Sequence, residues 1–450
     1  MDAQEKLQHY PQAVTPVYTT DVANASLQLF AGEFFLTQDN KTLSKERGNI
    51  EFIWLPSPKI RFTVPVANDR PELDMARLHL SHQNVSTEAI VTNVRIGSTD
   101  QPSYSGILAG EVIVQTNPQC DRVIFHVPNF THFLGTIVRN TEANHAWRGR
   151  LYLEYTDWII NIDEISSGKE VANSIRNEGG FAITHVGVIQ RKDGNLFSYQ
   201  DIQPILFGLR YFLSFARGLW CGPILPVGMS TDSSAWQIWN TSHLSPWKMV
   251  ESWFPYHEIN QIHEVNKAFQ GILSKLADPL WADPIKIAIH WFVEANLTNG
   301  GVEGAIVLTQ TALELLSWIY FVEDPKTSTM KDTKFDKLRA EDKIRNLLTS
   351  LQIPTIIPVE MTHLAAFAAT QGGADGPTSI VKLRNGVVHP KQIKRNYVLQ
   401  APRRARSEAQ ELGLWFLELA LLHMIGYDSI YYPRFLHDYP SNTKTKVPWG

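Results

Sequence analysis

Three side chains that suit phosphate chemistry lie close together in the segment LRNGVVHP, residues 383–390. Arg384 and Asn385 are adjacent, and His389 follows within the same short stretch. An arginine can stabilise charge on a phosphate, and a histidine can transfer a proton near neutral pH. If one helix end holds both side chains, the segment is a candidate site for phosphodiester cleavage.

The same segment also permits a second interpretation. Asn385-Gly386 between apolar residues is a strong signal for a two-residue β-hairpin turn. Pro390, however, leaves only Val387 to His389 for a returning strand. Although a glycine inside a helix costs about 1 kcal/mol relative to alanine, we predict a helix over 377–389. Because Pro390 disfavours helical geometry at the residue before it, His389 should be the last helical residue.

The spacing of the arginine and the histidine is not sufficient by itself, because Arg77 and His82 repeat it. That second pair lies in a segment that alternates like a strand, where odd spacing directs two side chains to opposite faces. In a helix over 377–389, by contrast, Asn385 and His389 share one edge and Arg384 falls within an apolar sector. Five residues form this sector: Ile380, Val381, Leu383, Val387 and Val388.

The environment of the predicted helix favours an anionic ligand. An arginine in an apolar sector is costly unless it is paired or faces a bound anion. At a helix C-terminus, the dipole favours a protonated imidazole, which suits a general acid. We therefore expect Arg384 to face a phosphate and His389 to donate a proton.

A run of positive charge surrounds the segment. Between Gly376 and Ser407 there is no aspartate or glutamate, although the chain as a whole has a net charge of -4. Such a run produces a strong local field for an anion such as an RNA backbone; a solvated basic loop that balances acidic surface elsewhere is the alternative. The basic residues are Lys382, Arg384, Lys391, Lys394, Arg395, Arg403, Arg404 and Arg406.

Size and composition indicate a folded protein with two domains. The chain has 450 residues, of which 44% are hydrophobic and 19% charged, and one core rarely organises such a length. Its two cysteines, Cys120 and Cys221, lie far apart and form no disulfide framework or CxxC pair. The polar N-terminal segment does not resemble a secretory signal. We expect a soluble cytoplasmic protein without a membrane span.

Hydrophobic periodicity changes along the chain and predicts an α+β fold. From about 25 to 200 the residues alternate like short strands, which favours a β-sandwich or a barrel-like sheet, with a helix over 201–218. After about 255 the pattern is helical and predicts an all-α bundle. We place the domains at 1–250 and 251–437, followed by a polar tail at 438–450. The predicted helices are 256–277, 284–298, 302–323, 335–350, 359–370, 377–389 and 403–427.

Familiar cofactor and metal motifs do not occur in this sequence. It has no GxxxxGK[ST], GxGxxG or GxSxG motif. His257 and His263 are six residues apart, which separates them around a helix and does not suit one metal ion. We therefore expect neither a metal nor a cofactor.

Taken together, the segment and its surroundings resemble the HEPN ribonucleases. In that family the active helix carries an arginine, a polar residue and a histidine four to six positions after the arginine, and RNGVVH matches this pattern at Arg384, Asn385 and His389. The surroundings are similar to the ApeA type of anti-phage abortive-infection protein. The similar stretches are IHWFVEANLTNGGVEGAIVLTQTALELLSWIYFVE, FDKLRAEDKIRNLL and VVHPKQIKR. This resemblance covers about 280–430, and less securely the β-rich half.

The resemblance implies metal-independent RNA cleavage at a site where two HEPN domains of a homodimer meet. Arg384 would stabilise phosphate charge, Asn385 would orient phosphate or histidine, and His389 would act as the general acid or base. The N-terminal domain would sense a phage-derived trigger. From the residues themselves we add RNA contacts by Lys382, Lys391, Lys394 and Arg395. Glu303 and Glu314 are possible orienting groups for the arginine, or else a helix N-terminal charge and a core polar group.

Two other functions compete with a defence ribonuclease. One is a non-catalytic HEPN protein that dimerises or binds RNA without turnover. The other, which we consider weaker, is a carbohydrate or peptide binder whose aromatic β-rich half would be the binding domain. Aromatic residues are more simply explained as core, so the first of the two is our main alternative.

Overall fold

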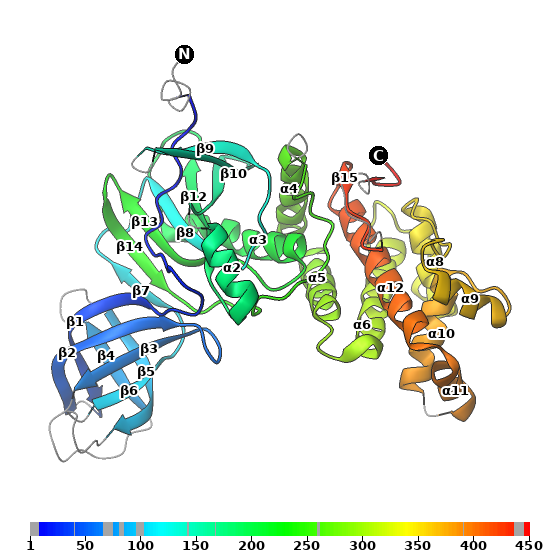
Figure 1. Ribbon diagram of the computed structural model, residues 1–450, viewed down its shortest axis with the longest axis horizontal. Coiled ribbons are helices and arrows are strands. Elements are labelled where there is room, and N and C mark those ends of the chain that lie inside the picture. The colour runs from blue at the N-terminus through cyan, green and yellow to red at the C-terminus, as the bar shows by residue number, and fades with distance from the viewer. Residues whose placement is uncertain are drawn as a thin grey trace. The chain divides into compact units, whose positions relative to one another are not determined.

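A computed structural model describes residues 9–39, 41–65, 75–80, 85–95, 103–141, 144–166, 168–258, 262–389, 391–435 and 445–450. The chain divides into two compact units (Figure 1). One unit comprises Met1–Phe207 and Cys221–Lys248, and the other comprises Gly208–Trp220 and Met249–Gly450. Because the first is rich in β-strands and the second is mainly helical, the predicted α+β class is confirmed.

Six strands of the first unit form a closed antiparallel barrel. The order is β1 (Leu27–Gln38), β2 (Lys41–Ile53), β3 (Lys59–Pro65), β6 (Ser103–Leu108), β5 (Val85–Arg95) and β4 (Met75–Leu80). In β3, Ile60, Phe62 and Val64 are buried and alternate with more exposed residues, as the period of a strand requires. Arg77 lies exposed in β4, as its alternation predicts. His82 lies outside the described residues.

The other eight strands of this unit form one open antiparallel sheet. Their order is β7 (Val112–Gln115), β14 (Ser233–Trp239), β13 (Ile224–Ser230), β8 (Arg122–Pro128), β12 (Ile183–Arg191), β11 (Trp158–Glu164), β10 (His145–Tyr155) and β9 (Thr136–Asn140). The unit also contains α2 (Gly168–Glu178) and the start of α3 (Tyr199–Arg217).

The predicted sandwich is therefore corrected to a barrel beside one sheet. Pairing of β1 with β4, from Phe34 opposite Leu80 to Thr37 opposite Arg77, closes the six strands on themselves. A closed barrel has no free edge strand. One hydrophobic core includes residues of both parts, and within it the Trp54 ring stacks on Phe181 with centroids 5.6 Å apart.

Residues 11–24, which we call the N-terminal strap, are hydrogen-bonded to the open sheet. The amide of Val14 donates to Asp163, whose carboxylate also receives a two-pronged hydrogen bond from Arg150. The amides of Val17 and Tyr18 both donate to Nε2 of His126, at 3.1 and 3.0 Å. This nitrogen must therefore be unprotonated, and burial lowers the pKa of His126 to about 4.

The second unit is a bundle of helices. After a 3₁₀ turn at Ile262–Glu264, it contains α4 (Val265–Ala277), α5 (Ala282–Leu297), α6 (Gly301–Trp318), α7 (Asp332–Phe335), α8 (Ala340–Ser350), α9 (Thr362–Thr370), α10 (Gly376–Val388), α11 (Gln392–Gln400) and α12 (Arg403–Met424). A π-helical turn, Ile319–Glu323, continues α6. Helix α11 was not predicted, and the predicted 335–350 helix is interrupted between α7 and α8.

The last described residues fold back onto the helical unit. Short strands β15 (Ile430–Tyr431) and β16 (Thr445–Lys446) pair, and the Trp449 indole donates to the carbonyl of Tyr427 at 2.9 Å. Of the predicted polar tail at 438–450, residues 445–450 are thus packed, and the remainder lies outside the described residues.

One helix among the described residues, Gly301–Glu323, is long and apolar enough to cross a membrane. The central helix of a helical bundle passes the same test, and 56% of its most apolar window is buried within this structure.

We expect acid to release part of the N-terminal strap. Burial lowers the pKa of His126 from its ordinary value of 6.5 to about 4 in the folded chain. The stabilisation that neutral His126 contributes by accepting these hydrogen bonds is therefore complete above pH 6.5 and is lost as the pH falls toward 4. Hydrogen exchange followed between pH 7 and pH 4, corrected for intrinsic rates, should show the amides of Val17 and Tyr18 losing protection. The amide of Asn24, which bonds the carbonyl of Phe181, is the internal control.

Candidate functional site

The segment around Asn385-Gly386 is helical, so the hairpin interpretation is wrong. At the start of α10, the Asp375 carboxylate caps the helix by accepting from the amide of Thr378 at 3.0 Å, and Pro377 occupies the first turn. Ile380, Val381 and Leu383 are buried. The helix ends at Val388, one residue earlier than predicted, and His389 is the extended C-cap residue whose amide donates to the carbonyl of Asn385.

Helix α10 lies close to α6 and α12 at a crossing that depends on a glycine. A Cβ atom on Gly413 of α12 would lie 2.6 Å from Oγ1 of Thr309 on α6. The same Cβ would lie 3.8 Å from Cδ1 of Ile380 on α10. Since Ile380 is fully buried, this crossing fixes the middle of α10 in the core of the bundle.

Gly386 allows a second close approach, which explains why a glycine is used inside this helix. A Cβ atom there would lie 2.3 Å from Cγ2 of Val398 and 2.7 Å from the carbonyl oxygen of Lys394. Both belong to α11, whose presence the sequence did not reveal. The close approach that requires a glycine at position 386 is therefore made by a helix of the same chain.

The apolar sector predicted for α10 is correct only for its first turns. Ile380, Val381 and Leu383 are buried, but Val387 and Val388 are 41% and 42% exposed. The structure shows why: α11 packs on the Gly386 side and leaves these valines uncovered. Together with two α11 residues that are 80% exposed, they form what we call the apolar patch, which consists of Val387, Val388, Ile393 and Leu399.

Arg384 is half-buried and has no carboxylate partner among the described residues. Its Nη1 donates to Oδ1 of Asn385 at 3.3 Å. Its Nε is buried, and no described group accepts a hydrogen bond from it. Arg384 and Asn385 thus form a contact at the end of α10 in which the guanidinium keeps unused donors, as a phosphate-binding group requires.

The surroundings of His389 favour its neutral form. Partial burial and the positive charges of Lys394, Arg384 and Lys391 lower the pKa of His389. These cations act against the attraction that the helix C-terminus exerts on a protonated imidazole. The neutral imidazole is the form that can accept a proton.

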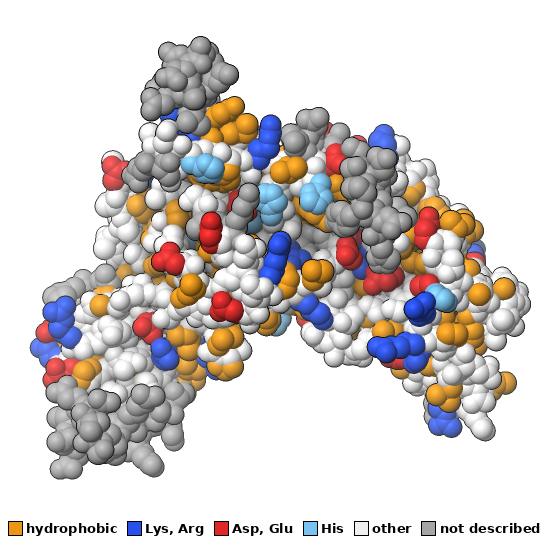
Figure 2. Space-filling model, viewed as in Figure 1, with side chains coloured by type: hydrophobic (Ala, Val, Ile, Leu, Met, Phe, Trp, Pro, Cys, Tyr) orange, Lys and Arg blue, Asp and Glu red, His pale blue; other side chains and the backbone are white. Residues whose placement is uncertain are grey.

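The predicted RNA-contacting residues lie around this helix end. Lys391 and Arg395 are exposed, whereas Lys394 and Lys382 are half-buried, with Nζ of Lys382 5.8 Å from the centre of the Tyr397 ring. In the described part of the chain, none of the four lies within 4.0 Å of a carboxylate oxygen. Figure 2 shows blue Lys and Arg atoms and orange apolar atoms in the region where Figure 1 places α10, α11 and the start of α12.

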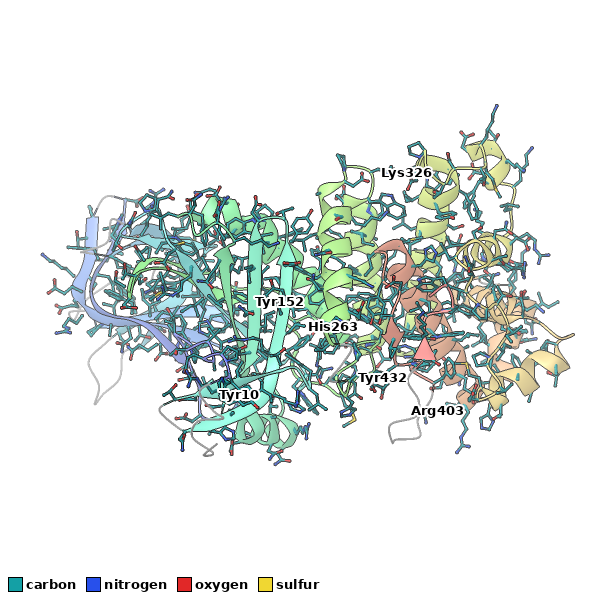
Figure 3. The ribbon with its side chains drawn as sticks, turned by 90° about the horizontal axis from the view of Figure 1, so that it is seen from above. Tyr10, Tyr152, His263, Lys326, Arg403 and Tyr432 are labelled. Carbon is teal, nitrogen blue, oxygen red and sulfur yellow. The ribbon has the colours of Figure 1, made fainter. Side chains whose placement is uncertain are left out.

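The remaining cations of the basic run belong to α12. Arg403 and Arg404 are exposed in its first turn, and Figure 3 labels Arg403 at the outer surface. Nη1 of Arg404 lies 3.5 Å from Nε2 of His363 on α9. Arg406 instead pairs with Glu303 of α6. Most of the run therefore stays uncompensated, as predicted, but Arg406 does not.

The two glutamates considered as orienting groups have other partners. Glu303 binds Arg406, and Glu314 accepts from Nε2 of Gln310 at 2.7 Å. Neither has a described contact with Arg384. The Arg406–Glu303 pair could not be predicted from the sequence, because it depends on how α6 and α12 pack. The Gln310–Glu314 pair is a local contact between residues four apart in one helix.

No group of three or more His, Cys, Asp or Glu side chains that could hold a metal ion occurs among the described residues. The His257 and His263 pair considered above includes a 69% exposed His263 that contacts its neighbour Glu264. Residues 259–261 between them lie outside the described part.

Two parts of the chain match known protein-family models. Residues 115–250 match the YopA central domain, and residues 278–444 match the YopA C-terminal domain. The chain resembles YopA. It is 25% identical over 443 residues to the "SPbeta prophage-derived uncharacterized protein YopA" of Bacillus subtilis (strain 168), with 95% of each chain covered. No solved structure matches the chain.

The two YopA matches cover different parts of the fold. The central-domain match begins at the last residue of β7 and covers the other seven strands of the open sheet. The C-terminal match contains Arg384, Asn385, His389 and all the cations of the basic run. Since neither description names an activity, the HEPN resemblance stays a prediction.

We expect Gly386→Ala to destabilise the helical unit. Alanine favours a helix by about 1 kcal/mol over glycine, but its Cβ would meet the Lys394 carbonyl and Val398, and overpacking typically costs about 1 to 3 kcal/mol. Urea denaturation should therefore show a net loss of stability.

Gly304→Ala is the matched control. Gly304 also lies in a helix, α6, and a Cβ there would meet nothing within 4 Å. This variant should keep or raise stability. Equal effects of the two substitutions would contradict the close packing of α10 on α11.

Proposed function

We propose that the chain is a metal-independent endoribonuclease of the HEPN type, with Arg384, Asn385 and His389 as its catalytic residues. The observation that carries this proposal is Arg384, a half-buried guanidinium without a described carboxylate partner. It lies beside an amide and near a histidine whose pKa neighbouring cations lower. A half-buried cation of this kind is stabilised by an anion, and an RNA phosphate supplies one.

The chemistry follows from the residue types. A neutral His389 removes the proton from a ribose 2′-hydroxyl, and the 2′-oxygen forms a bond to the adjacent phosphorus. The bond from phosphorus to the 5′-oxygen breaks, and that oxygen takes a proton from a protonated imidazole. Arg384 stabilises the added charge on the phosphate oxygens. The requirement for a 2′-hydroxyl restricts the substrate to RNA.

A homodimer through the helical unit supplies the second proton-transfer group. The attacking and leaving oxygens lie on opposite sides of phosphorus, so one imidazole cannot serve both at the same moment. His389 of a second protomer can protonate the leaving oxygen. The apolar patch lies at the same helix end as His389 and provides apolar area for burial against a second copy.

The β-rich unit is the proposed regulatory part, which responds to a phage-derived trigger and keeps the ribonuclease inactive until infection. The support is indirect. The YopA relative is prophage-derived by its printed name, and its similarity extends over both units. A nuclease that destroys cellular RNA must be restrained, so we propose a cytoplasmic protein that acts in abortive infection.

The alternative is an RNA-binding or dimerising HEPN protein without turnover. The exposed cations of α11 and α12 and the apolar patch favour it, because neither feature requires catalysis. Binding of RNA without cleavage would support this second function.

We expect purified protein, supplied with phage lysate if it is inactive alone, to cleave RNA in the presence of EDTA. Arg384→Ala and His389→Ala should each reduce the rate about 10² to 10⁴-fold, the usual range for such groups. Cleavage is measured with labelled RNA, and DNA of the same sequence should stay intact.

Arg339→Ala and His263→Ala are the matched controls, since both side chains are largely exposed and lie on other elements. They should cleave like the unmodified protein. Cleavage that survives both site substitutions would refute the site, and light scattering that shows an active monomer would refute the shared dimer.

The pH dependence of cleavage should report the lowered pKa of His389. As a general base, His389 is active when neutral, so the acidic limb of kcat/KM should have its midpoint below pH 6.5. Because the partner's imidazole must be protonated to act as the acid, kcat/KM should fall again at higher pH. Lys394→Gln removes one of the cations that lower this pKa and should move the rise toward 6.5. If the acidic limb of the kcat/KM profile is unchanged in Lys394→Gln, the role of His389 as general base is contradicted.

A further inference from the structure

Arg345 of α8 makes the most extensive polar contact with α10. Its Nε and Nη2 bind the two carboxylate oxygens of Asp375, at 2.7 and 3.1 Å, in a two-pronged arrangement. Nη2 also donates to Oγ1 of Thr378 at 2.9 Å, and Nη1 binds Asp342 on its own helix. One guanidinium thus holds both the cap residue and the first turn of α10.

Helix α8 is itself fixed in the bundle. Its Ile344, Leu347 and Leu348 are buried, and the hydroxyl of Ser317 on α6 donates to the carbonyl of Lys343 at 3.0 Å. Arg345 therefore connects α10 to a rigid support. Asp375 cannot shift along or around the helix axis without breaking one prong of the ion pair, because a guanidinium and a carboxylate bind in one plane.

The effect reaches the other end of α10 because a short helix moves as a rigid rod. From Asp375 to Arg384 the helix rises about 1.5 Å per residue, and its Pro377 lies in the first turn, where a proline does not kink a helix. A shift of the first turn therefore displaces Arg384 and His389 by a similar distance. Misplacement of a catalytic group by about 1 Å can cost on the order of 10²-fold in rate.

We propose that Arg345 is a positioning residue of this site, which acts through Asp375 to set the position of α10 and so of Arg384 and His389. This inference rests on the proposed ribonuclease function. It makes Arg345 a determinant of turnover and not of RNA affinity, because the cations that would bind RNA lie on α11 and α12 or at the far end of α10.

The test compares Arg345→Lys, Asp375→Asn and the double variant. Lysine keeps the charge but cannot form the two-pronged contact, and asparagine keeps the helix cap but loses the charge. Each single variant should lower kcat about 10 to 100-fold, with little change in KM or in binding of a 2′-O-methyl RNA that cannot be cleaved. If Arg345 acts through Asp375, the double variant should be no slower than the singles.

Arg339→Lys is the matched control, because Arg339 precedes the same helix but its side chain is 70% exposed and, among the described residues, is paired with Glu341 and Asp342 of that helix. It should cleave normally. Thermal unfolding of every variant is measured alongside, so that a loss of folded protein is corrected for.

The outcomes separate the two proposals. If the unmodified protein does not cleave RNA with or without phage lysate, the ribonuclease function fails. If it cleaves RNA and Arg384→Ala abolishes cleavage, but folded Arg345→Lys retains full kcat, the positioning role alone is refuted. A fall in kcat and RNA binding together, or multiplicative effects in the double variant, would likewise refute it.

Discussion

Close packing around α10 is the constraint on which the candidate site depends. Two glycines make it possible: Gly413 lets α12 approach Ile380 and Thr309, and Gly386 lets α11 approach the last turns of α10. A side chain at either position would push neighbouring helices apart, and packed interiors leave little room for such shifts. The position of Arg384 is therefore a consequence of backbone geometry two residues away, as well as of its own contacts.

That packing also determines the electrostatics of the helix end. Because α11 lies against Gly386, its Lys394 comes near enough to His389 to lower the imidazole pKa, together with Arg384 and Lys391. Cations gathered without acids repel one another and disfavour a protonated histidine. An anionic polymer that neutralises them would therefore be bound and would also change the proton affinity of His389, so binding and proton transfer are linked through charge.

Much of the helical unit could be predicted from the sequence, because amphipathic periods and the Asp375-Gly376-Pro377 start signal are local properties. The helix over LRNGVV was correctly preferred to a hairpin for the same reason. Helix α11 was missed because it has no buried residue and so no apolar period. The partner of Glu303 and the exposure of Val387 depend on helix rotation, which is set by tertiary packing. The sequence left a sandwich and a barrel-like sheet both open, because the pairing of β1 with β4 that closes the barrel involves residues distant in the sequence.

The N-terminal strap has a consequence for how the β-rich unit is made. Its hydrogen-bonding partners include His126, Asp163, Ser174 and Phe181, all more than 100 residues later in the chain. During synthesis the strap emerges first, but these partners follow only after the barrel strands, and the last strand of the open sheet ends at Trp239. The first described residues of the chain are thus among the last to reach their final place, and the open sheet must form before its N-terminal cover can dock.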